Sequence, residues 1–363
     1  MITRASVRRP ILAAWLTFLV FLGLFFADGA LARLERVEIQ REASNEYSEG
    51  MRLLGAGKAR EAAERFQRAY SIERSNRAYL IGYARSLMES ARPEEAAELL
   101  RLALNRSSND GESNLLMARI MAKGGKTAEA DAFYHRAVYG TWPENGEARV
   151  LETRLELAEY LAGHGSSRGL LAELLILQDE SANDPALGRK VAGLLLASGS
   201  ASRSAALYRE LLTREPHASD LWDGLGRAEL ESGDYRNATT AFLRVIRSDP
   251  LFDGAARRLR LSSELSRLDP TPRTLGSWEK YRRTVELLKR AVDGLGSCAP
   301  DDALLESVRE ELSRAGKLQR SPSNEDSEAV LKFAAEVWHE RVAVCAAPSP
   351  DDPLGPLMEK ISK

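Results

Sequence analysis

The chain has 363 residues, of which 44% are hydrophobic and 29% charged, and its formal net charge is −2 at pH 7. The ordinary apolar content excludes disorder throughout, and the near-neutral balance gives no electrostatic reason to expect a nucleic-acid partner. Two cysteines and four histidines exclude a disulfide-dense scaffold and a protein with several metal sites. What remains is a charged, alanine-rich, mostly helical chain, whose length allows two or three domains or one elongated array.

The first 32 residues are predicted to direct export. Arg4, Arg8 and Arg9 precede an uncharged run over residues 11–26, and Ala30-Leu31-Ala32 has the small-x-small pattern that a signal peptidase accepts. A cleaved secretory signal is one interpretation. The alternative is an uncleaved anchor, although the run is shorter than the ~20 residues that span a bilayer comfortably. Both place the rest of the chain in the periplasm or another extracytoplasmic compartment, touching the membrane only through this segment.

Residues 43 to 252 repeat with a period of 34 residues, interrupted by one longer interval near residues 139–146, which is expected to be a lengthened loop. A small residue stands in each copy where one helix must end and the chain reverse: Gly57, Ala91, Gly125, Gly165, Gly199 and Gly233. Another small residue precedes each turn by seven positions: Gly50, Ala84, Ala118, Ala158, Ala192 and Gly226. A large apolar residue follows each turn by nine: Phe66, Leu100, Tyr134, Leu174, Tyr208 and Phe242. The pattern predicts six pairs of helices that approach closely through the small residues.

This pattern resembles the tetratricopeptide repeat family, whose consensus sets W-x2-L-G before the turn and A-x3-F-x2-A after it. The sixth copy matches best, with Trp222, Leu225, Gly226, Ala238 and Phe242, whereas the first has Glu46 and Glu49 in place of Trp and Leu. The resemblance implies an all-α fold, a right-handed α-solenoid with six repeats over residues 43–76, 77–110, 111–144, 151–184, 185–218 and 219–252. A helical lead-in over residues 33–42 is expected before them, and a capping helix over residues 253–269 after them.

The period is lost after Pro270, and a small helical region is predicted over residues 270–363. Its helices are expected at roughly residues 277–295, 301–315, 323–344 and 351–362. Cys298 and Cys345 each follow a predicted helix end. In an exported chain, two cysteines in one small region favour a disulfide between them, and two buried thiols are the alternative.

No catalytic, cofactor-binding or metal site is predicted. The four histidines fall at unrelated points of the repeat, and no pair has the spacing of metal ligands. Residues 163–169 are rich in Gly and Ser but have neither the Rossmann nor the P-loop spacing. The chain is therefore not expected to be an enzyme or to need a cofactor.

In the tetratricopeptide family the first helix of each repeat lines a concave groove. Carried onto this chain, the groove positions include Tyr47, Met51, Ile81, Arg85, Leu115, Arg119, Leu155 and Arg227. The apolar row consists of Tyr47, Ile81, Leu115 and Leu155. It is expected to anchor an extended or helical partner segment, while Arg85 and Arg119 pair with the acidic groups of that segment. Family members that bind C-terminal carboxylates carry Lys and Asn where this chain has Tyr47 and Met51, so that mode is not implied. The alternative is that the chain's own terminal helices cover the row.

These observations predict a non-catalytic scaffold or adaptor in the cell envelope that binds a protein or peptide partner and no nucleic acid. One alternative is a regulatory or substrate-presenting subunit of an envelope enzyme, acting through the C-terminal helical region. Another makes that region a small catalytic domain.

Overall fold

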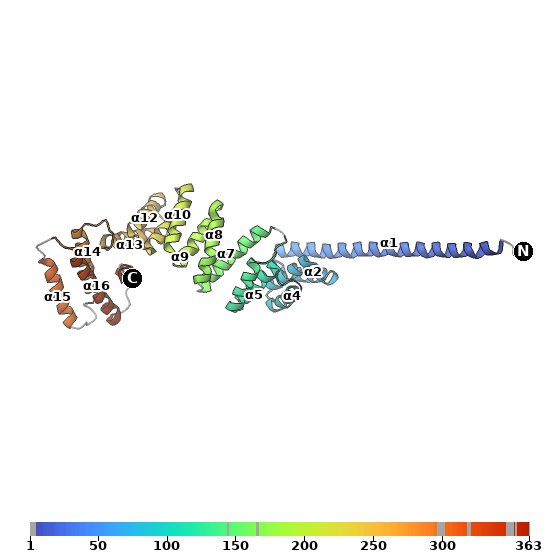
Figure 1. The fold of residues 1–363 in the computed structure, drawn as a ribbon, viewed down its shortest axis with the longest axis horizontal. Coiled ribbons are helices and arrows are strands. Elements are labelled where there is room, and N and C mark those ends of the chain that lie inside the picture. Colours follow the sequence, from blue (N-terminus) through green and yellow to red (C-terminus); the bar gives the residue numbers. More distant parts are fainter. Residues whose placement is uncertain are drawn as a thin grey trace. The chain divides into compact units, whose positions relative to one another are not determined.

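The computed structural model describes residues 5–143, 145–164, 167–295, 302–317, 321–345, 352 and 354–362. Across these residues the chain forms 17 α-helices and one short 3-10 helix, and no strand, which confirms the all-α prediction and the architecture of stacked helical repeats (Figure 1). The chain divides into two compact units, residues 1–164 and 165–363. The division falls between the two helices of the predicted fourth repeat.

The first unit consists of one long helix followed by six shorter ones. Figure 1 shows the long helix, α1, leading to the N-terminus. The bounds are α1 Ala5–Gly55, α2 Ala59–Ile72, α3 Arg77–Glu89, α4 Pro93–Arg106, α5 Gly111–Lys123, α6 Thr127–Val138 and α7 Gly146–His164. The predicted lead-in and the first helix of repeat one are therefore parts of the single helix α1. Within the described residues, no helix meets the length and apolarity required to cross a membrane.

The repeat turns follow the predicted small residues. Gly57, Gly125, Gly199 and Gly233 have φ between 70° and 78°, a conformation that suits a residue without Cβ. Ala91 occupies the same turn in repeat two with φ 60°, where a side chain is strained. Gly165, the predicted turn residue of repeat four, lies outside the described residues.

Close helix packing through small residues is confirmed in both units. A Cβ atom added to Gly50 would lie 2.9 Å from the ring of Phe66, and one added to Gly226 would lie 2.6 Å from the ring of Phe242. Both phenylalanine rings are fully buried. A larger residue at either glycine would hold the two helices of the repeat apart.

The longer interval between repeats three and four forms a loop that folds back onto the first unit. The backbone N–H of Thr141 donates to the carbonyl of Asn109 at 2.7 Å, and the N–H of Gly111 donates to the carbonyl of Thr141 at 3.0 Å. The indole of Trp142 lies where a Cβ of Gly111 would come within 2.4 Å of it. The loop is therefore attached to the start of α5 by both hydrogen bonds and packing.

The second unit continues the repeats and then adds four helices. Its helices are α8 Ser167–Glu180, α9 Pro185–Ala197, α10 Ala201–Arg214, α11 Ser219–Glu231, α12 Tyr235–Ser248, α13 Ala255–Leu268, α14 Ser277–Leu295, α15 Asp302–Gly316, α16 Asn324–Val344 and α17 Leu354–Ser362, with the 3-10 helix η1 at Ser181–Asn183. Ser323 and Asp326 exchange side-chain and backbone hydrogen bonds in a capping box at the start of α16. Each satisfies one backbone N–H that the helix leaves free.

The C-terminal helices share a core with the last repeat. Tyr235 of α12 and Leu265 and Leu268 of α13 pack with Trp338 of α16 and Leu357 of α17. The predicted capping helix α13 is thus covered in turn by later helices. Cys345 is disulfide-bonded, but Cys298 lies outside the described residues, so the pairing of these two cysteines stays a prediction.

Candidate functional site

A cavity of about 480 Å³ opens on the first unit where the first helices of successive repeats lie together. Residues from α1, α3, α5 and α7 line it, together with the loop that contains Trp142. Four predicted groove residues meet in this groove cavity: Tyr47, Met51, Ile81 and Arg85. Tyr47 and Met51 lie one helical turn apart on α1, as do Ile81 and Arg85 on α3, so each pair presents one helix face.

The apolar side of the groove cavity is smaller than the predicted row. Met51 is 46% exposed, whereas Ile81 is only 5% exposed. The ring of Tyr47 packs between Phe66 and Tyr79, with centroid distances of 5.5 and 5.1 Å. Met51 is therefore the apolar side chain most available to a ligand.

Leu115 and Leu155 do not line the groove cavity. Leu115 is 4% exposed and Leu155 is half-buried. Leu115 and Leu155 thus take no part in the lining of this cavity, and their place in an apolar groove row stays a prediction. Trp142, Pro143 and Asn145 of the folded-back loop complete the described lining of the cavity.

Three arginines surround one carboxylate in the groove cavity. Arg85 forms an ion pair with Glu112, Arg77 lies 3.2 Å from it, and Arg149 lies 3.5 Å from it. The Glu112 side chain is 13% exposed. Arg77 also donates to the carboxylate of Asp110. Arg149 also lies 3.2 Å from the carboxylate of Glu152, so three guanidinium groups share three carboxylates and the formal charges balance.

Asp110 ties this charged cluster to the backbone. Its carboxylate caps α5 by accepting a hydrogen bond from the N–H of Ser113 at 2.7 Å. Burial raises the pKa of Asp110, but the hydrogen bonds from Arg77 and Ser113 lower it by more, so the net shift of its pKa is downward. Asp110 therefore stays ionised and keeps Arg77 beside Glu112.

Arg119 also pairs with an acid of its own chain. Its guanidinium donates two hydrogen bonds to the carboxylate of Glu156, at 2.8 and 2.7 Å, and Tyr134 donates a third at 2.9 Å. Burial, and then the charge of Glu156, raise the pKa of the Tyr134 phenol. Arg119, like Arg85, is thus already paired with an acid from a neighbouring helix, and its pairing with a partner's acidic group stays a prediction.

Charged residues of the second unit also form ion pairs within the chain. Arg258 donates to Asp223 at 2.6 Å, and Arg189 binds both Glu215 and Asp220. Arg227 is exposed on α11 and lines none of the cavities described here. Among the residues that the structure describes, no group of His, Cys, Asp or Glu could hold a metal ion.

Sequence reasoning missed Arg77, Glu112, Trp142 and Arg149. None of the four stands at the repeat positions that Ile81 and Arg85 occupy in the second repeat. Two of them follow the point where the 34-residue period is interrupted. The only signal was the extra length of the loop itself. Nothing in the spacing showed that the loop would fold back over α5.

Comparisons with known proteins agree with the helix arrangement. Residues 53–120 and residues 192–260 each match a family model described as tetratricopeptide repeat. Among solved structures, the chain is similar to YrrB, described as a tetratricopeptide protein with an unusual peptide-binding site, at 15% identity and a TM-score of 0.44, covering 55% of this chain and 99% of that one.

Two further solved structures are similar. A tetratricopeptide repeat protein from Parabacteroides merdae is 14% identical, with a TM-score of 0.42 over 81% of this chain and 99% of that one. The C-terminal part of a repeat protein from Cytophaga hutchinsonii is 11% identical, with a TM-score of 0.44 over 87% and 99%. A search of curated proteins found no match.

Proposed function

Because the chain contains tetratricopeptide repeats, we propose that it is a non-catalytic scaffold that holds a segment of a partner protein in the groove cavity of its first unit. Repeat proteins of this kind are generally scaffolds for protein–protein interaction, since stacked repeats supply an extended concave surface. The observation that carries the proposal is the meeting of Tyr47, Met51, Ile81 and Arg85 in one cavity.

The groove cavity suits binding better than catalysis. Among the described residues, its lining contains no Ser, Cys, His or Lys that could act as a nucleophile or base, and the carboxylate of Glu112 is already bound by arginines. Met51 offers an exposed apolar contact in the same cavity as the guanidinium groups of Arg77, Arg85 and Arg149. The matching partner segment carries a large apolar side chain next to an acidic one.

The same proposal places the protein outside the cytoplasm. Its support is the run without charged residues over 11–26, which follows three arginines, together with the Ala30-Leu31-Ala32 pattern. Intact-mass measurement of the protein from its native cell tests this part. A mature chain that begins near residue 33 supports export, and an unprocessed chain found in the cytoplasmic fraction contradicts it.

The groove is tested by crosslinking and mass spectrometry with the substitution Met51→Glu. Because position 51 is exposed, the substitution should leave the fold intact. The new charge removes the apolar contact, so the crosslinks between the partner and α1 or α3 should be lost. Leu251→Glu is the matched control, because Leu251 is 93% exposed and lies outside the groove cavity. An identical set of crosslinked partners in both variants would refute the groove proposal.

A further inference from the structure

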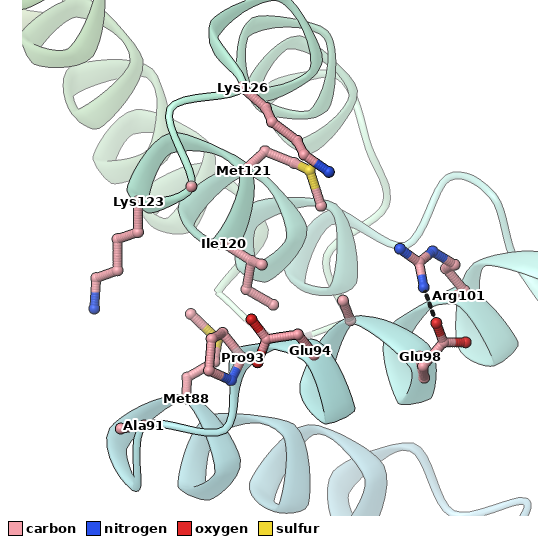
Figure 2. A pocket seen from close by; sticks show the side chains of 12 residues that line it. Met88, Ala91, Pro93, Glu94, Glu98, Arg101, Ile120, Met121, Lys123 and Lys126 are labelled. Atoms are coloured by element: carbon pink, nitrogen blue, oxygen red, sulfur yellow. Dashed lines mark hydrogen bonds and ion pairs between the residues drawn. The ribbon is translucent and has the colours of Figure 1, made fainter.

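The first unit has a second cavity, of about 610 Å³, between α4 and the turn that joins α5 to α6 (Figure 2). None of its lining residues belongs to the groove cavity. Its base is apolar and is formed by Met88, Ala97, Ile120 and Met121, all buried or half-buried. Methionine side chains are flexible and polarisable, so a base of this kind can adapt to the shape of an inserted side chain.

The cavity exists because α4 and α5 are joined at one end only. At the loop between them, the side chain of Asn114 donates to the carbonyls of Ser108 and Asp110, both at 2.9 Å. At the other end, where α4 begins and α5 finishes, no side-chain hydrogen bond or ion pair joins the two helices in the described part of the chain. The apolar residues that α4 contributes to the lining, Pro93 and Ala97, are too small to fill the cavity.

All charged residues of the cavity stand at its rim and are exposed. Glu98 pairs with Arg101 on α4, as Figure 2 shows. Glu94 on α4, and Lys123 and Lys126 on the opposite rim, form no ion pair within the described residues. The two rims therefore present uncompensated charges of opposite sign on either side of an apolar base.

This distribution favours a helix over a small molecule. Small-molecule sites bury a few placed polar groups that orient the ligand, whereas here no lining residue has a buried polar side chain. An apolar centre with a charged rim is instead the anatomy of a protein interface. A helix also offers apolar side chains on one face with charged side chains along both edges.

We propose that this second cavity docks an amphipathic helix of a partner protein, independently of the groove. The apolar face of that helix enters the base formed by Met88, Ile120 and Met121. Acidic side chains along one edge meet Lys123 and Lys126, and a basic side chain along the other edge meets Glu94.

The test uses the full-length chain and labelled synthetic helical peptides of about five turns, with binding measured by fluorescence anisotropy. All peptides share one leucine stripe. The mixed peptide has Glu along one edge of the stripe and Lys along the other, and the two comparison peptides have Glu along both edges or Lys along both. The mixed peptide should bind roughly tenfold more tightly than either comparison peptide, because only it matches both rims.

Protein variants then locate the binding. Lys123→Glu combined with Lys126→Glu makes both rims acidic at exposed positions, so the preference should move to the peptide with Lys along both edges. Met121→Glu should weaken the mixed peptide roughly tenfold, whereas Leu251→Glu, at an exposed residue outside both cavities, should leave its binding unaltered.

Three results would overturn the proposal. The first is equal affinity for all three peptides. The second is an unchanged preference in the double lysine variant, which is expected to fold because both side chains are exposed. The third is binding of a small apolar dye that Met121→Glu abolishes while no peptide binds, which would make the cavity a small-molecule site.

Discussion

The ammonium group of Lys360 lies 2.7 Å from the carboxylate of Asp269 and donates a second hydrogen bond, at 2.9 Å, to the carbonyl of Gly233. Lys360 belongs to the last helix, α17, Asp269 follows α13, and Gly233 is the turn residue of repeat six. One side chain therefore joins the end of the chain to the last repeat. The Asp269 side chain is only 3% exposed, and its other oxygen accepts hydrogen bonds from the N–H and the hydroxyl of Thr271.

Lys360→Ala should destabilise the second unit by about 2 kcal/mol, because it leaves a buried carboxylate without its cation. Urea denaturation followed by circular dichroism measures the loss. Lys332→Ala is the control, since Lys332 is exposed and forms no ion pair within the described residues. Equal stability of the two variants would show that the Lys360 contact contributes nothing.

Truncation after Pro270 should lower the melting temperature of the second unit and promote aggregation. It removes Leu287, Trp338 and Leu357, which cover Tyr235 and Leu265 of the last repeat and the helix after it. Thermal unfolding and size-exclusion chromatography provide the measurement. A truncated chain that stays monomeric and melts at the temperature of the intact one would show that the C-terminal helices form an independent domain.

Gly226→Ala should destabilise the protein although alanine favours helices. The added Cβ would lie 2.6 Å from the fully buried ring of Phe242, and overpacking of this kind costs about 1–3 kcal/mol. Gly55→Ala is the matched control, because no atom lies within 4 Å of a Cβ placed there. The Gly55→Ala variant should be as stable as the original chain or more stable. If urea denaturation shows Gly55→Ala to be less stable than Gly226→Ala, the close-packing argument is contradicted.

The first unit should lose stability as the pH falls below about 4, partly through Asp110. Hydrogen bonds hold the pKa of Asp110 below its unfolded value, so the unfolded chain binds a proton more readily. The contribution is present above the unfolded pKa and is lost as the pH falls through the folded pKa. Asp110→Asn should therefore flatten the dependence of the unfolding free energy on pH, whereas Glu129→Gln, at an exposed residue without an ion pair in the described part, should not.

Cys345 and Cys298 should be joined within one chain. Alkylation of the unfolded, unreduced protein should label neither cysteine, and reduction should make both reactive. Closing a loop of this length stabilises the folded state by about 4 kcal/mol in the chain-entropy model, so reduction should lower the urea midpoint of the second unit. Labelling before reduction, or a reducible dimer on electrophoresis, would contradict the pairing.

The sequence alone was sufficient to predict the repeats, because they depend on local and periodic features. A small residue at each turn and another seven positions earlier, with a large apolar residue after each turn, determine where helices end and how closely they pack. For the same reason the register identified Tyr47, Met51, Ile81 and Arg85, which lie one helical turn apart on neighbouring helices.

Only the tertiary structure decided which charges are available and where the cavities lie. Arg85 and Arg119 carried the same expectation, and an acid from a neighbouring helix reaches each of them. Arg149 joins Arg77 and Arg85 around Glu112 at the mouth of a cavity that the folded-back loop bounds. Long charged side chains pair according to distances between helices in space, and the 34-residue period does not encode those distances.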